Sequence, residues 1–172
     1  ERAEAGLSTV IKDIDEKTAR LFMETFQAVN ANFGLLFNRL FGARSAEESA
    51  AELVLLDPAN PLESGVDIIA RPPGKKPQTI SLLSGGEKTL TAVALLFAVF
   101  LVRPSPFAVL DELDAPLDDA NVGKYVQLLK EFSQRTQFII VTHNKRTMEA
   151  ADTLHGVSQI EKGISRIIGV RL

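Results

Sequence analysis

The sequence predicts an α/β fold with a parallel sheet core, flanking helices and one long N-terminal helix. Two observations carry this prediction. An apolar run at residues 107–110 suits a strand buried on both faces, and residues 138–142 suit a second buried strand, with a helical pattern between them. Strand, helix and strand at this spacing form a parallel unit with a right-handed crossover. A second helical pattern, with no proline, extends from residue 1 to about residue 41.

Composition limits the class of protein. The chain has 172 residues, 45% of them hydrophobic, which suits one globular domain with a short appendage. Its net charge of −3 gives no general basic field for nucleic acid. It has no cysteine, which excludes disulfides and cysteine-based zinc sites. The most apolar run, residues 90–102, is shorter than a membrane-spanning helix, and we expect no membrane contact.

Residues 1–41 are predicted to form one helix that ends at Gly42. Its first half is charged and has a narrow apolar stripe, as at the end of a coiled coil, whereas its second half is rich in phenylalanine and should be buried. So short a window cannot establish heptads, and an ordinary amphipathic helix is the alternative. The chain begins on Glu1 inside this pattern, so we expect a fragment of a longer protein.

The remaining segments are predicted from local composition. Residues 43–50 should form a polar surface loop, and residues 52–56 and 66–70 two strands with a turn at 57–61. Residues 71–77 read as a solvated loop, with contact of its cations to nucleic acid as the alternative. We expect a short strand at residues 80–83, and two edge strands at residues 153–160 and 165–170.

Ser84, Gly85 and Gly86 precede an apolar helical pattern that continues from Glu87 to Val102. The helix should therefore begin near Gly85 or Gly86. The first amides of a helix have no partner within it, and its dipole favours an anion there. Glycines allow the backbone to approach a ligand closely, and the Ser84 hydroxyl adds a donor, so the place suits a terminal phosphate. The alternative is a plain N-cap serine followed by a plain turn.

Asp111 and Glu112 follow the first apolar strand of the parallel unit, and His143 follows the second. Ligands of parallel sheets bind at these carboxyl ends, and consecutive acids there are hard to explain by packing. We expect Asp111 to hold Mg²⁺ through water, Glu112 to orient or deprotonate an attacking water, and His143 to contact the phosphate or that water. A surface or capping pair and a structural histidine are the alternatives. Together with Ser84 in chain order, the three residues favour an ATPase.

Several of these stretches resemble known motifs. Residues 83–87 look like the ABC signature motif, residues 107–112 like a Walker B strand with its catalytic glutamate, Leu117-Asp118 like the D-loop and His143 like the switch histidine. Four further stretches are similar in sequence to the SMC (structural maintenance of chromosomes) family, of the bacterial condensin type. They are residues 109–121, 142–145, 147–152 and 170–172.

The resemblance implies that residues 1–41 are the neck helix of a coiled-coil arm and that residues 42–172 are the C-terminal lobe of an ABC-type ATPase head. It implies ATP and Mg²⁺ as cofactors. The chain contains no GxxxxGK[ST] phosphate loop, so the N-terminal lobe of the same head should supply one. In this family Asp111, Glu112 and His143 would serve the head's own nucleotide.

The other nucleotide contacts implied by the resemblance are those to ATP held by a second head. They belong to the signature motif and the D-loop, and the residues concerned are Ser84, Gly85, Gly86, Glu87 and Asp118. Further implied partners are a kleisin subunit and DNA. The implied role is condensation, organisation and segregation of chromosomes, in the cytoplasm at the nucleoid.

Three rival interpretations share part of this evidence. A RecN-like repair ATPase would have the same site with a different helix and tail. A transporter ATPase is disfavoured by residues 1–41 and by Glu87, where transporters usually carry glutamine. A non-catalytic module that binds DNA or a kleisin is disfavoured by the intact Glu112.

Overall fold

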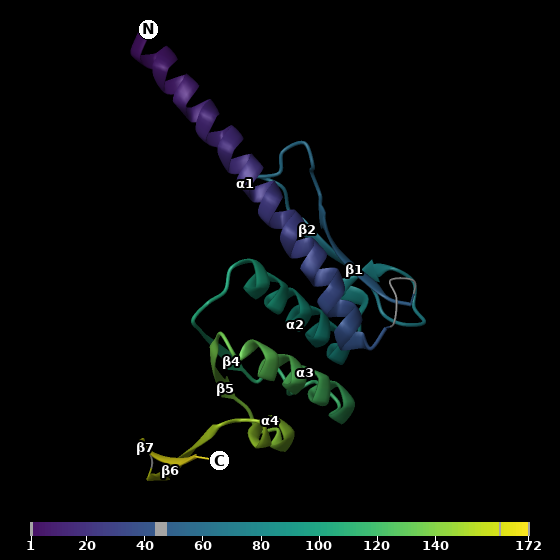
Figure 1. Ribbon diagram of the computed structural model, residues 1–172, viewed down its shortest axis with the longest axis vertical. Helices are drawn as coiled ribbons and strands as arrows, with labels where there is room; N and C mark the ends of the chain where they lie inside the picture. The colour runs from purple at the N-terminus through teal and green to yellow at the C-terminus, as the bar shows by residue number, and fades with distance from the viewer. Residues whose placement is uncertain (1, 44–47, 162, 172) are drawn as a thin grey trace. The chain divides into compact units, whose positions relative to one another are not determined.

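The computed structural model describes residues 2–43, 48–161 and 163–171, and it divides into two compact units, residues 1–105 and 106–172. Each unit is described by itself. The first contains a long helix, a small antiparallel sheet and a second helix (Figure 1). The second contains a two-stranded parallel sheet, two helices and a C-terminal hairpin.

Helix α1, Arg2–Phe41, has the predicted length. Residues 10–18 are exposed, whereas the second half buries Val29, Phe33, Leu36, Phe37 and Leu40. The helix ends as predicted, because Gly42 has a φ of 72° and the Ala43 amide donates to the Asn38 carbonyl at 2.9 Å. Figure 1 shows the N-terminal half extending away from the other elements of its unit.

Helix α2, Gly85–Val102, packs against α1 and forms the other half of this core. Its buried side chains are Leu90, Thr91, Val93, Ala94, Phe97 and Ala98. The helix is longer than the apolar run that sequence analysis judged too short for a membrane, and by length and composition alone it could cross one. Packing against α1 accounts for the buried apolar side chains, as in the core helix of a globular unit, whereas Val99 and Leu101 are 41% and 50% exposed.

The small sheet of this unit has the order β1-β2-β3, with both pairs antiparallel. Strand β1, Ala50–Leu55, alternates between exposed and buried side chains, and Asn30 of α1 accepts a hydrogen bond from the Leu53 amide at 2.7 Å. Strand β2 is Val66–Arg71 and strand β3 is Gln78–Thr79. An edge strand has unpaired backbone groups, so Asn30 both satisfies β1 and attaches it to α1.

Two sequence predictions in this unit have different outcomes. The strand expected at residues 80–83 is wrong, because Ile80–Leu82 forms the 3-10 helix η1, closed by the Leu83 amide on the Ile80 carbonyl at 3.2 Å. The chain has to turn here to enter α2. Half of the surface loop expected at residues 43–50, residues 44–47, lies outside the described residues. At its end the prediction is wrong, because Ser49 is buried and Ala50 already belongs to β1.

The second unit has the predicted parallel crossover. Strands β4, Phe107–Asp111, and β5, Gln137–Val141, pair in parallel, with Asp111 opposite Val141. Helix α3, Asp119–Phe132, connects them and buries Val122, Tyr125, Leu128 and Leu129. The short helix α4, Lys145–Glu149, follows β5.

The expectation that β4 is buried on both faces, and that β5 is a second buried strand, is wrong for the described chain. Ala108 and Leu110 are buried, but side chains of the opposite face are 51–60% exposed. They are Phe107 and Val109 of β4 with Ile139 and Val141 of β5. The apolar sequence had predicted burial, yet among the described residues this sheet has two strands and the face is exposed.

Strands β6, Thr153–Glu161, and β7, Ile164–Arg171, form the C-terminal antiparallel hairpin and confirm the two strands expected there. Gly163, with a φ of 90°, lies in the connection between them. Several apolar side chains of the hairpin are exposed, namely Val157, Ile164, Ile167, Ile168 and Val170. The division of the chain at residues 41 and 42 into a neck helix and a lobe stays a prediction.

Candidate nucleotide site

Glu112 and His143 meet at the carboxyl end of the parallel sheet. The Glu112 amide donates to the Val141 carbonyl at 2.9 Å, which extends the strand pairing by one residue beyond β4. From there the Glu112 side chain places Oε1 3.9 Å from Nδ1 of His143. Both side chains are accessible, 60% exposed for Glu112 and 72% for His143. The structure thus brings together the two residues that were predicted to act on a water and a phosphate.

The backbone of Glu112 is itself unusual. Its φ of 49° lies in the left-handed region, which residues other than glycine rarely adopt, and it is the one such residue in the described part of the chain. Strain of this kind persists where surrounding contacts maintain it, and it is often found at functional sites. Here the left-handed residue follows directly after the last residue of β4, and its carboxylate lies near His143, which follows β5.

Asp111 is the last residue of β4 and is exposed. Carboxylate oxygens suit Mg²⁺, so Asp111 fits the expected metal contact by its chemistry and its position. Within the described residues no group of three or more histidine, aspartate or glutamate side chains is placed to hold a metal ion. Asp111 can therefore supply only part of a coordination sphere, and water and phosphate oxygens would have to complete it.

Asp118 has a structural role in addition to its predicted one. It is the N-cap of α3, and its carboxylate accepts hydrogen bonds from the Asn121 amide at 2.9 Å and the Asn121 side chain at 3.2 Å. Such a cap satisfies an amide that has no partner within the helix. The contact of Asp118 with nucleotide stays a prediction.

Asp114, which sequence analysis did not select, links the segment after β4 to the segment that carries His143. It is 1% exposed. Its Oδ2 accepts a hydrogen bond from the Thr142 hydroxyl at 2.6 Å and a short one from the Thr147 hydroxyl. Thr142 immediately precedes His143, and its Oγ1 in turn accepts from the Asn144 amide at 2.9 Å. The Asp114 carboxylate therefore joins the segment that follows Glu112 to the segment that contains His143.

A tyrosine lies in the electrostatic field of this carboxylate. Burial of Tyr125 raises the pKa of its hydroxyl well above the usual value, and the negative charge of Asp114 raises it further. Tyr125 is fully buried, and neither its hydroxyl nor Asp114 Oδ1 has a hydrogen-bond partner among the described residues. Asp114 was missed because four other acidic residues stand close to it in the sequence, namely Asp111, Glu112, Asp118 and Asp119, and nothing local marks Asp114 as the buried one.

We predict that Asp114→Ala lowers the free energy of unfolding of the protein by about 3 kcal/mol, because the buried hydroxyl of Thr147 and the half-buried hydroxyl of Thr142 lose their acceptor. Chemical denaturation of the wild type and the variant would measure this. Asp152→Ala is the matched control: Asp152 is exposed, and a surface change of this kind shifts stability by less than about 0.5 kcal/mol. Equal losses for the two variants would contradict the role assigned to Asp114.

In the other unit, Ser84 begins α2 as the sequence predicted. The Ser84 amide and hydroxyl both donate to Glu87 Oε2, at 3.0 and 2.8 Å, in a capping box. The N-cap alternative is thus correct for the helix boundary, and it is compatible with a phosphate contact. Gly85 leaves open space where a side chain would project, so a ligand could approach the first turn closely.

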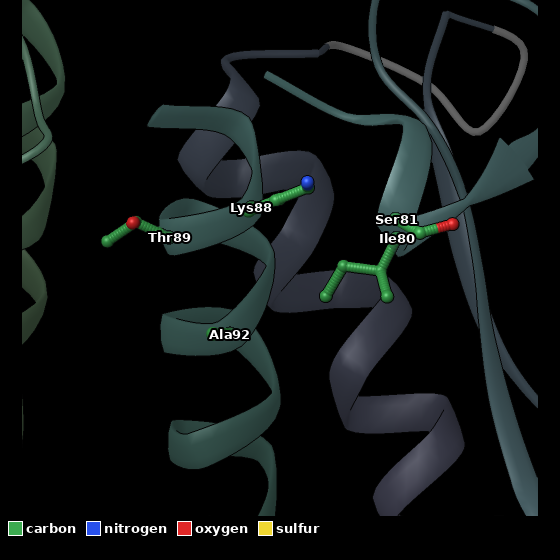
Figure 2. Close-up of a pocket in the computed structure, with 5 residues that line it drawn as sticks. All are labelled: Ile80, Ser81, Lys88, Thr89 and Ala92. Atoms are coloured by element: carbon green, nitrogen blue, oxygen red, sulfur yellow. The ribbon is translucent and has the colours of Figure 1, made fainter. Parts of the chain in front are cut away.

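Figure 2 shows a pocket beside this first turn, between η1 and α2. It is lined by Ile80, Ser81, Lys88, Thr89 and Ala92. The Lys88 side chain extends from α2 toward η1 (Figure 2), which adds a cation near a helix N-terminus that already favours anions.

Lys75 is the second residue that sequence analysis missed. Its Nζ lies 2.8 Å from Oε1 and 2.9 Å from Oε2 of Glu87. The loop is exposed at residues 73–77, as expected for a solvated loop, and the ion pair of Lys75 is a contact that the prediction did not include. Burial of the Glu87 carboxylate raises its pKa, but hydrogen bonds from Lys75 and Ser84 and the Lys75 charge lower it by more, so the net pKa is below the ordinary value.

Comparison with known proteins identifies the family of the chain. The family model described as "RecF/RecN/SMC N terminal domain" matches residues 10–166. The Chromosome partition protein Smc of Myxococcus xanthus (strain DK1622) is 50% identical over 166 residues, which is 96% of this chain and 13% of that protein. The chain thus spans a small part of the curated relatives it matches.

Two solved structures are similar to the chain. One is the Smc head domain with an extended coiled coil bound to the C-terminal domain of ScpA, derived from Pyrococcus furiosus. It has a TM-score of 0.83 and 38% identity, and the match covers 97% of this chain and 40% of that one. The other comes from work on ATP-driven dimerisation and DNA-stimulated activation of SMC ATPases. It has a TM-score of 0.75 and 40% identity, with coverage of 88% and 89%. The predicted mixed α/β fold with a long N-terminal helix is confirmed by these head domains.

Proposed function

Because the chain belongs to the RecF/RecN/SMC N terminal domain family and has the fold of an SMC head domain, we propose that it is the C-terminal ATPase lobe of such a head. In this proposal it completes an ATP site with an N-terminal lobe, and two heads engage around ATP. Hydrolysis then drives condensation, organisation and segregation of the chromosome at the nucleoid, in the cytoplasm.

The observation that carries this proposal is the meeting of Glu112 and His143 at the carboxyl end of β4 and β5. In the proposal Glu112 accepts a proton from a water that attacks the terminal phosphate, and His143 donates a hydrogen bond to that phosphate or to the water. Asp111 would hold Mg²⁺, whose charge would offset that of the phosphates. These roles require accessible side chains, and Asp111, Glu112 and His143 are all exposed.

A second observation supports completion by another lobe. The uncovered sheet face of Phe107, Val109, Ile139 and Val141 is apolar and contiguous in the parallel register. Exposed apolar patches of this kind generally mark a surface that another element covers. We assign this covering to the N-terminal lobe, which would bring the phosphate loop that the chain lacks.

The remaining partners are proposed from the similar structures. The Pyrococcus furiosus head is bound to the C-terminal domain of ScpA, which supports a kleisin as a partner of this chain. The work on ATP-driven dimerisation and DNA-stimulated activation supports a second head and DNA. In this arrangement Ser84, Gly85, Gly86, Glu87 and Asp118 face the nucleotide held by the second head.

The test is ATP hydrolysis by this chain alone and after co-folding with the cognate N-terminal segment. We expect turnover only in the mixture, with a second-order dependence on head concentration, because each site needs residues from two heads. Robust turnover by the chain alone would contradict the proposed need for a second lobe. A correctly folded mixture without turnover would contradict the ATPase proposal and favour a non-catalytic module.

A further inference from the structure

The turn at residues 72–75 brings a lysine to the signature motif. The Lys75 amide donates to the Pro72 carbonyl at 3.1 Å, and Gly74 has a φ of 75°, a conformation that favours glycine. Proline followed by glycine at the two central positions, with this hydrogen bond, is typical of a type II turn. Pro72 is buried and anchors the turn. The Lys75 ammonium therefore meets Glu87 because the backbone is constrained, not only because a long side chain is mobile.

Glu87 has two opposing effects on a phosphate site. Through Oε2 it accepts hydrogen bonds from the amide and the hydroxyl of Ser84, and this fixes the entrance to α2. The same carboxylate carries a negative charge in the first turn, next to the amides of Gly85 and Gly86 that would receive the phosphate. Like charges at such a distance repel each other, and the repulsion is larger where water is partly excluded. The Glu87 side chain is only 19% exposed.

Lys75 offsets this charge at both carboxylate oxygens, and it does so from a loop outside α2. We propose that Lys75 is a positioning residue of the ATP site, the counter-ion that lets Glu87 hold Ser84 in place without repelling the terminal phosphate. This inference rests on the proposed function, since it concerns the same phosphate contact. It adds a residue that no signature motif contains.

The test is a double-mutant cycle in the full-length protein, carried in the Glu112→Gln background so that hydrolysis does not separate the heads. The dissociation constant of ATP-dependent head engagement is measured without DNA for Lys75→Met, Glu87→Gln and the double variant. We expect Lys75→Met to raise this dissociation constant about tenfold, because the Glu87 charge would no longer be neutralised. The dissociation constant of the double variant should lie within about twofold of that of Glu87→Gln alone, since the Glu87 charge that Lys75 would neutralise is already absent.

Lys76→Met is the matched control, because it removes the same charge from the same loop and Lys76 has no ion-pair partner among the described residues. It should leave engagement unchanged. Raising the salt concentration should reduce the Lys75→Met defect, because salt screens charge repulsion and would not repair a misfolded loop. Lys75→Arg keeps the charge and should restore most of the engagement.

A Lys75→Met defect that persists in the Glu87→Gln background would overturn the inference and indicate a direct contact of Lys75 with nucleotide. An absence of any defect would overturn it as well. The proposed function is tested separately in the same assay by Ser84→Arg. If Ser84→Arg abolishes engagement and Lys75→Met does not alter it, only the role of Lys75 is wrong. If Ser84→Arg has no effect, the phosphate contact itself is wrong.

Discussion

Glu112→Gln should lower ATP turnover by the completed head about 10²- to 10⁴-fold, the usual contribution of a general base, and should leave two heads engaged around ATP. Glutamine has nearly the same shape and can still orient a water molecule, but it cannot accept a proton at neutral pH. It also removes a negative charge from the neighbourhood of the terminal phosphate. Binding therefore persists while hydrolysis stops.

Steady-state phosphate release would measure the loss of turnover, and light scattering coupled to size exclusion would measure the engaged heads. Glu149→Gln is the matched control, since Glu149 is an exposed residue at the end of α4 and the chemical change is the same. Its turnover should equal that of the wild type. If Glu112→Gln also kept full turnover, the proton acceptor would have to be another group.

Ser84→Arg should abolish ATP-driven engagement, with a loss of at least about 100-fold in affinity, as for a central residue of an interface. The variant removes the hydroxyl that is available to a phosphate and the hydrogen bond to Glu87. It also places a long side chain where Gly85 leaves open space for a ligand. ATP bound to a head's own N-terminal lobe should remain bound, because Ser84 would contact the nucleotide of the second head.

The two consequences are separable by measurement. Equilibrium binding of labelled ATP to single heads should be unchanged, whereas sedimentation at rising head concentration should show no ATP-dependent dimer. Ser133→Arg makes the same substitution at an exposed serine that follows α3 and should dimerise normally. A dimer of normal affinity formed by Ser84→Arg would exclude Ser84 from the nucleotide interface.

The sequence alone was sufficient for the features that depend on neighbours in the chain. Periodicity predicted the forty residues of α1, Gly42 its end, and Ser84 with Gly85 the start of α2. The apolar runs at β4 and β5 predicted the parallel pair, and the polar residues after them predicted Glu112 and His143 at one edge. Hydrophobic period, capping and the geometry of parallel strands are properties of short segments, so a single sequence contains them.

The tertiary structure decided the contacts between residues that are distant in sequence. Asp114 reaches hydroxyls 28 and 33 residues away, and Lys75 reaches a carboxylate 12 residues away. No local sequence pattern predicts either contact, because each depends on how the chain folds between the two residues. The uncovered face of β4 and β5 was likewise invisible, since an apolar strand has the same sequence whether this chain or another lobe covers it. The left-handed backbone of Glu112 was also unpredicted, since its amide bonds to the Val141 carbonyl of the neighbouring strand, and this contact exists only in the folded protein.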